Sequence, residues 1–174
     1  DYPNDFSYPG GPAIRPYENT GYTVAYQMGV QFDRILNGFN GPFENVAGMA
    51  TPPKGTVADA SGAAGFLFSH AENDAFTVVN RLLATHADVY WIKSPVTARG
   101  RTYPAGTFYV AAGSAANDVI RKAASELGVD FQGTAGRAGA DAIKLKRERI
   151  ALWDMYGGSM PSGHIRWLLE QFEF

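Results

Sequence analysis

Residues 154–164, DMYGGSMPSGH, hold the side chains with the greatest capacity for chemistry in this sequence. Asp154, Ser159, Ser162 and His164 are the residue types of a serine hydrolase triad, in which histidine takes a proton from serine and a carboxylate orients the histidine. The segment lacks the G-x-S-x-G nucleophile elbow. Serine and glycine are also what a strand-to-helix turn needs for capping, so a structural turn with Ser162 as the helix N-cap explains the same residues.

The glycines of this segment suggest a second kind of site. Gly157, Gly158, Ser159 and Gly163 lie where the chain is expected to leave a strand and enter a helix. Backbone N–H groups in such a turn can hold a small anion. Anion binding at this turn is therefore an alternative to catalysis.

A metal site would need several histidine or carboxylate ligands, and the chain has three histidines and no cysteine. His70 is expected at the carboxyl end of a strand and His86 after the following helix, about 20 Å away at 1.5 Å per residue, so one ion cannot bind both. His70 with Glu72 and Asp74 could form a small acidic pocket near His164, but an exposed turn with a capped helix explains these residues better. No metal site is predicted.

Length and composition limit the class of protein. A chain of 174 residues with 45% hydrophobic residues can build one domain with a substantial core. Its net charge of −2 gives no electrostatic reason to expect nucleic acid or an anionic membrane as a partner. No apolar run approaches the roughly 20 residues that span a bilayer, so no membrane partner is expected.

Residues 1–63 are predicted to differ from the rest of the chain. Proline and glycine punctuate residues 1–22, which predicts an extended strap. A short helix from Thr23 and a strand from Val30 follow, and residues 37–63 read as a Gly/Pro-rich linker. The regular α/β domain is expected at residues 64–174.

In residues 64–174, strand and helix patterns alternate. Strands are expected at 65–69, 88–93, 107–111, 129–132 and, as one or two strands, 143–153; helices are expected after a capping box of Ser69 and Glu72, after an N-cap at Asn117, and at 163–172. Gly128 is expected to end the second helix. This alternation predicts a mostly parallel, flavodoxin-like sheet flanked by helices on both faces. Because the last helix would ordinarily lead into another strand, we expect the sheet to be continued by residues not present here.

Four segments carry a resemblance to a known family: RPYENTGYTVAYQMGV at 15–30, NRLLATHADVYW at 80–91, YPAGTFYV at 103–110 and RIALWDMYGGSMPSGHIRWLLEQFEF at 149–174. They resemble large bacterial zinc carboxypeptidases. In those proteins a metallopeptidase domain is followed by a region similar to the class I glutamine amidotransferase fold, and the chain resembles that later region. At His164 it departs from the family pattern, which has an aromatic residue there.

The resemblance implies a non-catalytic accessory domain of a secreted or periplasmic zinc carboxypeptidase-like hydrolase. The zinc-binding His-x-x-Glu motif, the third histidine ligand and the catalytic glutamate have no counterpart here, and the amidotransferase cysteine is absent. Zinc is therefore expected only in the peptidase domain, with no cofactor in this chain. The expected partners are that peptidase domain and a peptide substrate. The alternatives are a small serine hydrolase using Ser159 or Ser162 with His164, and a small-anion binding module at the same turn.

Overall fold

The computed structural model describes residues 5–14, 24–33, 35–51 and 53–174. The chain divides into two compact units, Asp1–Ala47 and Gly48–Phe174. The boundary lies within the segment expected to be a linker.

The first unit holds little regular structure in its described part. Its helix α1 is the four-residue segment Val24–Gln27, in agreement with the short helix expected after Thr23, but no strand forms from Val30 to Asp33. Phe6 and Ala13 form an isolated antiparallel bridge. None of its described residues is buried. The expected strap falls partly at residues 1–4 and 15–22, which lie outside the described residues.

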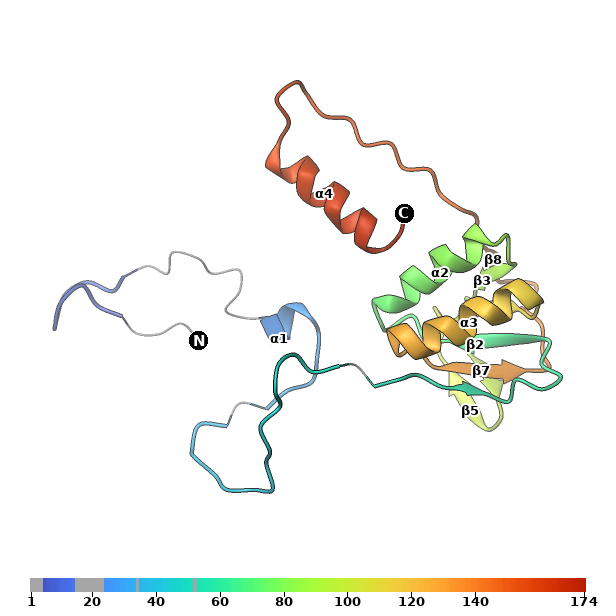
Figure 1. The fold of residues 1–174 in the computed structure, drawn as a ribbon, viewed down its shortest axis with the longest axis horizontal. Coiled ribbons are helices and arrows are strands. Elements are labelled where there is room, and N and C mark those ends of the chain that lie inside the picture. The colour runs from blue at the N-terminus through green and yellow to red at the C-terminus, as the bar shows by residue number, and fades with distance from the viewer. Residues whose placement is uncertain (1–4, 15–23, 34, 52) are drawn as a thin grey trace. The chain divides into compact units, whose positions relative to one another are not determined.

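The second unit contains the sheet and the three longer helices (Figure 1). Its elements are β1 Val57–Ala58, β2 Gly65–Phe68, α2 Asp74–Ala84, β3 Val89–Trp91, β4 Val96–Ala98, β5 Arg101–Tyr103, β6 Phe108–Ala111, α3 Ser114–Leu127, β7 Phe131–Thr134, β8 Ile143–Lys144 and α4 Met160–Gln171. The expected strands before α3 lie at their predicted places. Strand β1 and the β4–β5 hairpin have no counterpart among the predicted elements, and the strand expected over 143–153 is only two residues long.

The sheet is mixed and mainly antiparallel, so the predicted mostly parallel, flavodoxin-like or amidotransferase-like sheet is wrong. Its six strands lie in the order β1-β7-β2-β6-β3-β8. Only β1 and β7 pair in parallel, while the β2–β6, β2–β7, β3–β6 and β3–β8 pairs are antiparallel. A second sheet consists of β4 and β5 alone.

The helical crossovers explain why an alternating sequence gives this sheet. Strands β2 and β3 run in the same direction on either side of α2, but β6 lies between them. In the same way, β2 lies between β6 and β7, which flank α3. A helix about 10 Å wide spans two strand spacings of about 4.8 Å, so each crossover leaves room for one antiparallel strand. The β2-α2-β3-β6-α3-β7 core therefore has the connectivity of a ferredoxin-like, split βαβ unit.

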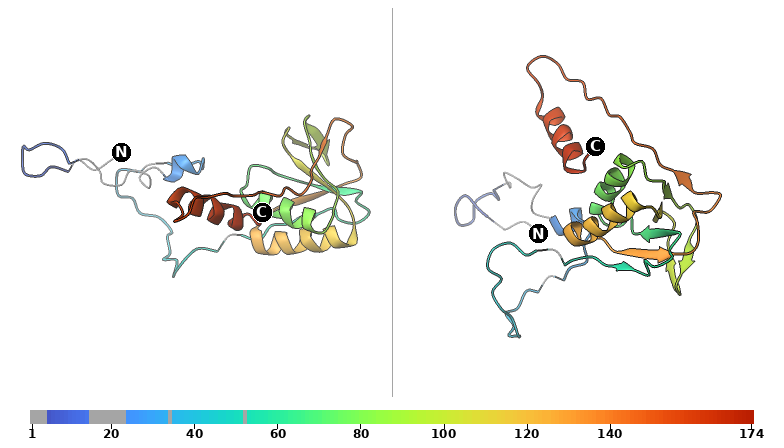
Figure 2. Two further views of the ribbon diagram at one scale, coloured as in Figure 1. Left: turned by 90° about the horizontal axis from the view of Figure 1, so that it is seen from above. Right: turned by 45° about the vertical axis from the view of Figure 1, so that its right-hand side comes forward.

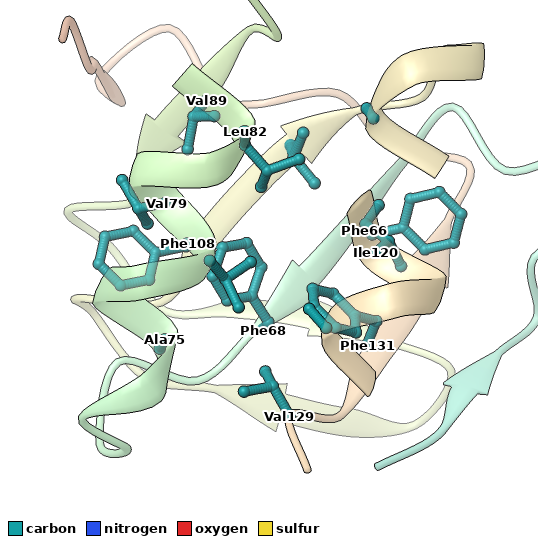
Figure 3. Close-up of a cluster of buried hydrophobic side chains, with 14 of the residues drawn as sticks. Phe66, Phe68, Ala75, Val79, Leu82, Val89, Phe108, Ile120, Val129 and Phe131 are labelled. Atoms are coloured by element: carbon teal, nitrogen blue, oxygen red, sulfur yellow. The ribbon is translucent and has the colours of Figure 1, made fainter. Parts of the chain in front are cut away.

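Both helices of this core cover the same face of the sheet (Figure 2). Side chains at alternating strand positions point to them, including Phe66 and Phe68 of β2 and Phe131 of β7. Leu82 of α2 and Ile120 of α3 complete this layer and are fully buried (Figure 3). Burying a side chain of this size contributes about 1.5 to 3 kcal/mol. This cluster is the main core of the unit.

The opposite face is covered by the β4–β5 hairpin, not by helices as expected. Leu67 and Tyr109 point to this side and form a second cluster with Ala98 and Tyr103 of the hairpin. Strand β2 is consequently buried at every position. A strand buried on both faces reads as a continuous apolar run, which is the pattern typical of parallel sheets.

The helix boundaries agree only partly with the capping signals. Gly128 ends α3 in the left-handed conformation with φ of 74°, which confirms the predicted terminal glycine. Asn117 lies inside α3, whose N-cap is Gly113, and α2 has Asn73 as its N-cap without a side-chain cap hydrogen bond. No described helix is long and apolar enough to cross a membrane.

Candidate functional site

The predicted turn places Asp154 at the start of α4. One carboxylate oxygen of Asp154 accepts hydrogen bonds from the Ser159 N–H, at 2.7 Å, and from the Ser162 hydroxyl. The other oxygen accepts the Met155 N–H at 2.8 Å. The Ser162 hydroxyl is the main cause that lowers the pKa of Asp154 below its ordinary value. The carboxylate therefore ties the turn to the first turn of the helix.

Ser159, rather than the predicted Ser162, is the N-cap of α4. It has extended backbone angles, and its hydroxyl accepts the Ser162 N–H at 3.3 Å. Helix α4 begins at Met160 instead of Gly163, with proline in its first turn. Proline fits there because the first helical N–H groups have no partner inside the helix. Ser162 is thus within the helix, with its side chain folded back on Asp154.

The structure does not assemble these residues into a triad. A triad needs histidine between the serine hydroxyl and the carboxylate. Ser162 instead donates directly to Asp154, and its oxygen lies 2.8 Å from that of Ser159. His164 is exposed, and in the described part of the chain no hydrogen bond joins it to Ser159, Ser162 or Asp154. The turn brings two serines and a carboxylate together without the histidine of a triad.

Three of the four residues predicted to bind an anion already have acceptors for their backbone N–H groups. The Gly158 N–H donates to the Met155 carbonyl, the Ser159 N–H to Asp154, and the Gly163 N–H to the Ser159 carbonyl. An anion would have to displace these internal bonds. Anion binding at residues 157–163 stays a prediction, and it would require the turn to open.

The three histidines lie apart from one another in the fold. His70 follows β2 and packs against Gly106, and its Nδ1 atom is buried without a hydrogen-bond partner among the described residues. His86 follows α2 with a positive φ of 60°. Within the described ranges, no group of three or more His, Asp or Glu side chains is placed to hold a metal ion.

A different site, missed by the sequence analysis, lies where β2 ends and β7 begins. Because these strands are antiparallel, the residues after β2 meet those before β7 at one end of the sheet. A cavity of about 160 Å³ opens there, bounded by the β4–β5 hairpin and by the residues before β1. Its charged lining side chains are Glu72, Arg101 and Asp130.

Hydrogen bonding fixes Asp130 in this cavity. One of its carboxylate oxygens accepts both the N–H of Thr56, at 2.8 Å, and the Thr56 hydroxyl, at 2.7 Å. The Thr56 hydroxyl is the main cause that lowers the pKa of Asp130. Asp130 therefore stays ionised near neutral pH and joins the edge strand β1 to the sheet.

Glu72 and Arg101 line the same cavity without pairing to each other. Partial desolvation and then the charge of Asp130 raise the pKa of Glu72. Arg101 lies 5.2 Å from the ring centroid of Tyr103 and forms no ion pair with any described residue. Two carboxylates that repel each other and one guanidinium thus face a small common space.

The sequence contained only part of this site. Glu72 was considered for an acidic pocket with His70 and Asp74, but an exposed turn with a capped helix was the preferred interpretation. Asp130 and Thr56 are 74 positions apart, and Arg101 belongs to a hairpin that was not predicted. Only the strand order brings the three charges together.

Comparison of the chain with protein-family models, with curated proteins and with solved structures found no match.

Proposed function

We propose that this chain is a non-catalytic accessory domain of a zinc carboxypeptidase-like hydrolase, and that it docks on a peptidase domain through α4. The observation that carries the proposal is the exposure of this helix. None of its residues is buried, although Ile165, Leu168, Leu169 and Phe172 form a stripe along one side. Ile165 is 49% exposed and Leu168 is 51% exposed. Contiguous apolar surface of this kind marks interaction sites.

The attachment of α4 to its own unit leaves Ile165 and Leu168 of this stripe exposed, while Leu169 and Phe172 are half-buried. A long segment without helix or strand connects β8 to α4 (Figure 1). The hydrogen bonds and ion pairs described between α2 and the C-terminal segment lie at its end, where Asn80 donates to the Phe172 carbonyl and Arg81 pairs with Glu173. The apolar residues Ile150, Leu152, Trp153 and Met155 of the connecting segment are also exposed. Helix and segment together offer an apolar surface to a partner.

The proposal draws its partner from the resemblance to zinc carboxypeptidases, which includes residues 149–174. A peptidase domain in the same parent protein would cover this surface. Because the two domains would belong to one chain, their association would not have to overcome the loss of translational freedom that two separate molecules suffer on binding. The accessory role then consists of orienting that domain or presenting peptide substrate to it.

The test combines mass and binding measurements. The intact mass of the native protein should exceed that of this chain by at least one domain. The separately expressed peptidase part should then bind the chain in calorimetry, and Ile165→Ser with Leu168→Ser should weaken binding by about tenfold or more, since each removed side chain contributes about 1.5 to 3 kcal/mol when covered. Gln171→Ser, on another side of the helix, is the control. A native mass equal to that of this chain, or binding insensitive to the stripe, would contradict the proposal.

The serine hydrolase alternative is tested on the same preparation. Ester hydrolysis that is lost in Ser162→Ala and in His164→Gln would favour it over the accessory role. In the structure the Ser162 hydroxyl donates its hydrogen bond directly to the Asp154 carboxylate, without a histidine between them, so we expect no ester hydrolysis.

A further inference from the structure

The cavity between Glu72, Arg101 and Asp130 has a composition that suits one class of ligand. Charges of opposite sign line the same space of about 160 Å³, and the two signs are not joined in an ion pair. Ser69 and Thr102 also line it. A ligand that carries an ammonium group and a carboxylate would give each charge a partner.

We propose that this cavity binds a small zwitterionic molecule, an amino acid or a short peptide, with its ammonium group against Glu72 and Asp130 and its carboxylate paired with Arg101. The inference does not rest on the docking of α4. Drug-sized ligands occupy pockets of roughly 300 to 1,000 Å³, so a cavity of this volume suits a smaller molecule.

The carboxylates are placed to receive a cation. Thr56 occupies one oxygen of Asp130, and the other oxygen accepts no hydrogen bond from a described residue. Glu72 accepts none either, and the neighbouring charge of Asp130 contributes to the rise in its pKa. An ammonium group between the two would relieve this repulsion, because it favours the ionised form of both carboxylates.

Arg101 is prepared for a carboxylate. It stacks near Tyr103, which is 8% exposed and anchored in the second core cluster. A guanidinium held by an aromatic ring keeps its planar fork of donors for bidentate pairing with a carboxylate. The hairpin thereby positions the guanidinium over the cavity.

The test is a titration of the full chain with glycylglycine and, separately, with alanine, followed by two-dimensional NMR. Glycylglycine separates its two charged groups by a peptide bond, whereas alanine carries its ammonium group and its carboxylate on one carbon. Amide shifts should appear at Thr56, Ser69, Arg101 and Asp130, and the probe that binds more tightly distinguishes a peptide from a free amino acid. Propylamine and acetate, which carry one charge each, should bind at least about tenfold more weakly.

Variants separate binding from folding. Glu72→Gln and Arg101→Gln replace exposed side chains and should each weaken binding by about tenfold or more. Asp118→Asn and Arg121→Gln, an exposed pair on α3, are the matched controls and should leave binding unchanged. Asp130 is not substituted, because its removal would also break its two hydrogen bonds with Thr56 and loosen the attachment of β1.

The protonation of Glu72 provides a second readout. An ammonium group favours the ionised carboxylate, so the ligand should lower the pKa of Glu72, and binding should be lost as the pH falls through that pKa. The absence of amide shifts with both glycylglycine and alanine at millimolar concentration would overturn the proposal. Equal binding of propylamine, or binding that Arg101→Gln does not weaken, would also overturn it.

Discussion

At the scale of single residues, backbone space is as important as side-chain chemistry. Gly133 of β7 lies against the backbone of Asp59, so that a Cβ atom at this position would collide with the Asp59 carbonyl group. Gly136, three residues later, would place a Cβ only 3.4 Å from the Thr134 hydroxyl. The two glycines lie in the same Gly/Ala-rich segment but have different neighbours.

Gly133→Ala should therefore destabilise the protein by about 1 to 3 kcal/mol, the usual range for overpacking, because a backbone carbonyl cannot move aside like a flexible side chain. Gly136→Ala should change the free energy of unfolding by less than about 0.5 kcal/mol. Urea unfolding of both variants measures the difference. Equal stabilities would show that β1 can move away from β7 without cost.

The turn before α4 supports a prediction about protonation. The folded-state pKa of Asp154 is lowered, so its contribution to the turn is present above the ordinary value and is lost as the pH falls through the lowered value. Ser162→Ala should raise the pKa of Asp154, because the Ser162 hydroxyl is the main cause of the shift. Carboxyl NMR titration measures the change, and His164→Gln is the control. A pKa that responds to His164 instead would favour the triad interpretation.

At the scale of elements, the two crossover helices carry the core. Helices α2 and α3 lie side by side over the sheet, and each contributes fully buried apolar residues (Figures 2 and 3). Helix α4 has an apolar stripe as well, but the described sheet does not cover it. The apolar stripe alone therefore does not distinguish a core helix from an interaction helix. The difference is whether the sheet covers the stripe, as it does for α2 and α3, or leaves it uncovered, as it does for α4.

Ile120→Ala should lower the free energy of unfolding by about 2 to 5 kcal/mol, since it leaves a cavity between α3 and the sheet. Lys122→Ala on the same helix removes only an exposed ion pair with Glu126, so its effect should stay within about 0.5 kcal/mol. Chemical denaturation compares the two. A small effect of Ile120→Ala would mean that α3 is not part of the cooperative unit.

At the scale of the whole molecule, the second unit should fold by itself. Both core clusters lie within Gly48–Phe174, and no described residue of the first unit is buried. Stability comes mainly from buried apolar area, so residues 1–47 should add little to it.

A chain of residues 48–174 should therefore unfold at the same urea concentration as the full chain, within the error of the measurement. Limited proteolysis gives a second measurement, because cuts should fall in the exposed segment 37–51 before residues 55–58. Gly55 donates to the Ala124 carbonyl and Thr56 to Asp130, which fixes the latter segment to the domain. A large loss of stability in the shorter chain would show that the first unit packs on the second.

The sequence by itself determined the elements that local chemistry controls. The continuous apolar run at Gly65–Phe68, helical spacing through Leu82 and Ile120, and the left-handed Gly128 each depend on neighbours within a few positions. It also showed that β2 and β3 run in the same direction, because a helical crossover requires this. The candidate residues Asp154, Ser159 and Ser162 do meet, since they are only eight positions apart, although their roles within the turn differ from those predicted.

Only the tertiary structure decided which strands are neighbours in the sheet. The order of the strands in turn determines the fold class and the formation of the charged cavity. A crossover helix is wide enough to leave a gap for one strand, and whether β6 fills that gap is settled by packing between residues far apart in the chain. The continuous burial of β2 did not distinguish cover by helices on both faces from cover by one helical layer and a hairpin. Asp130, Arg101 and Glu72 meet for the same reason: antiparallel pairing of β2 with β7 places the end of one strand beside the start of the other.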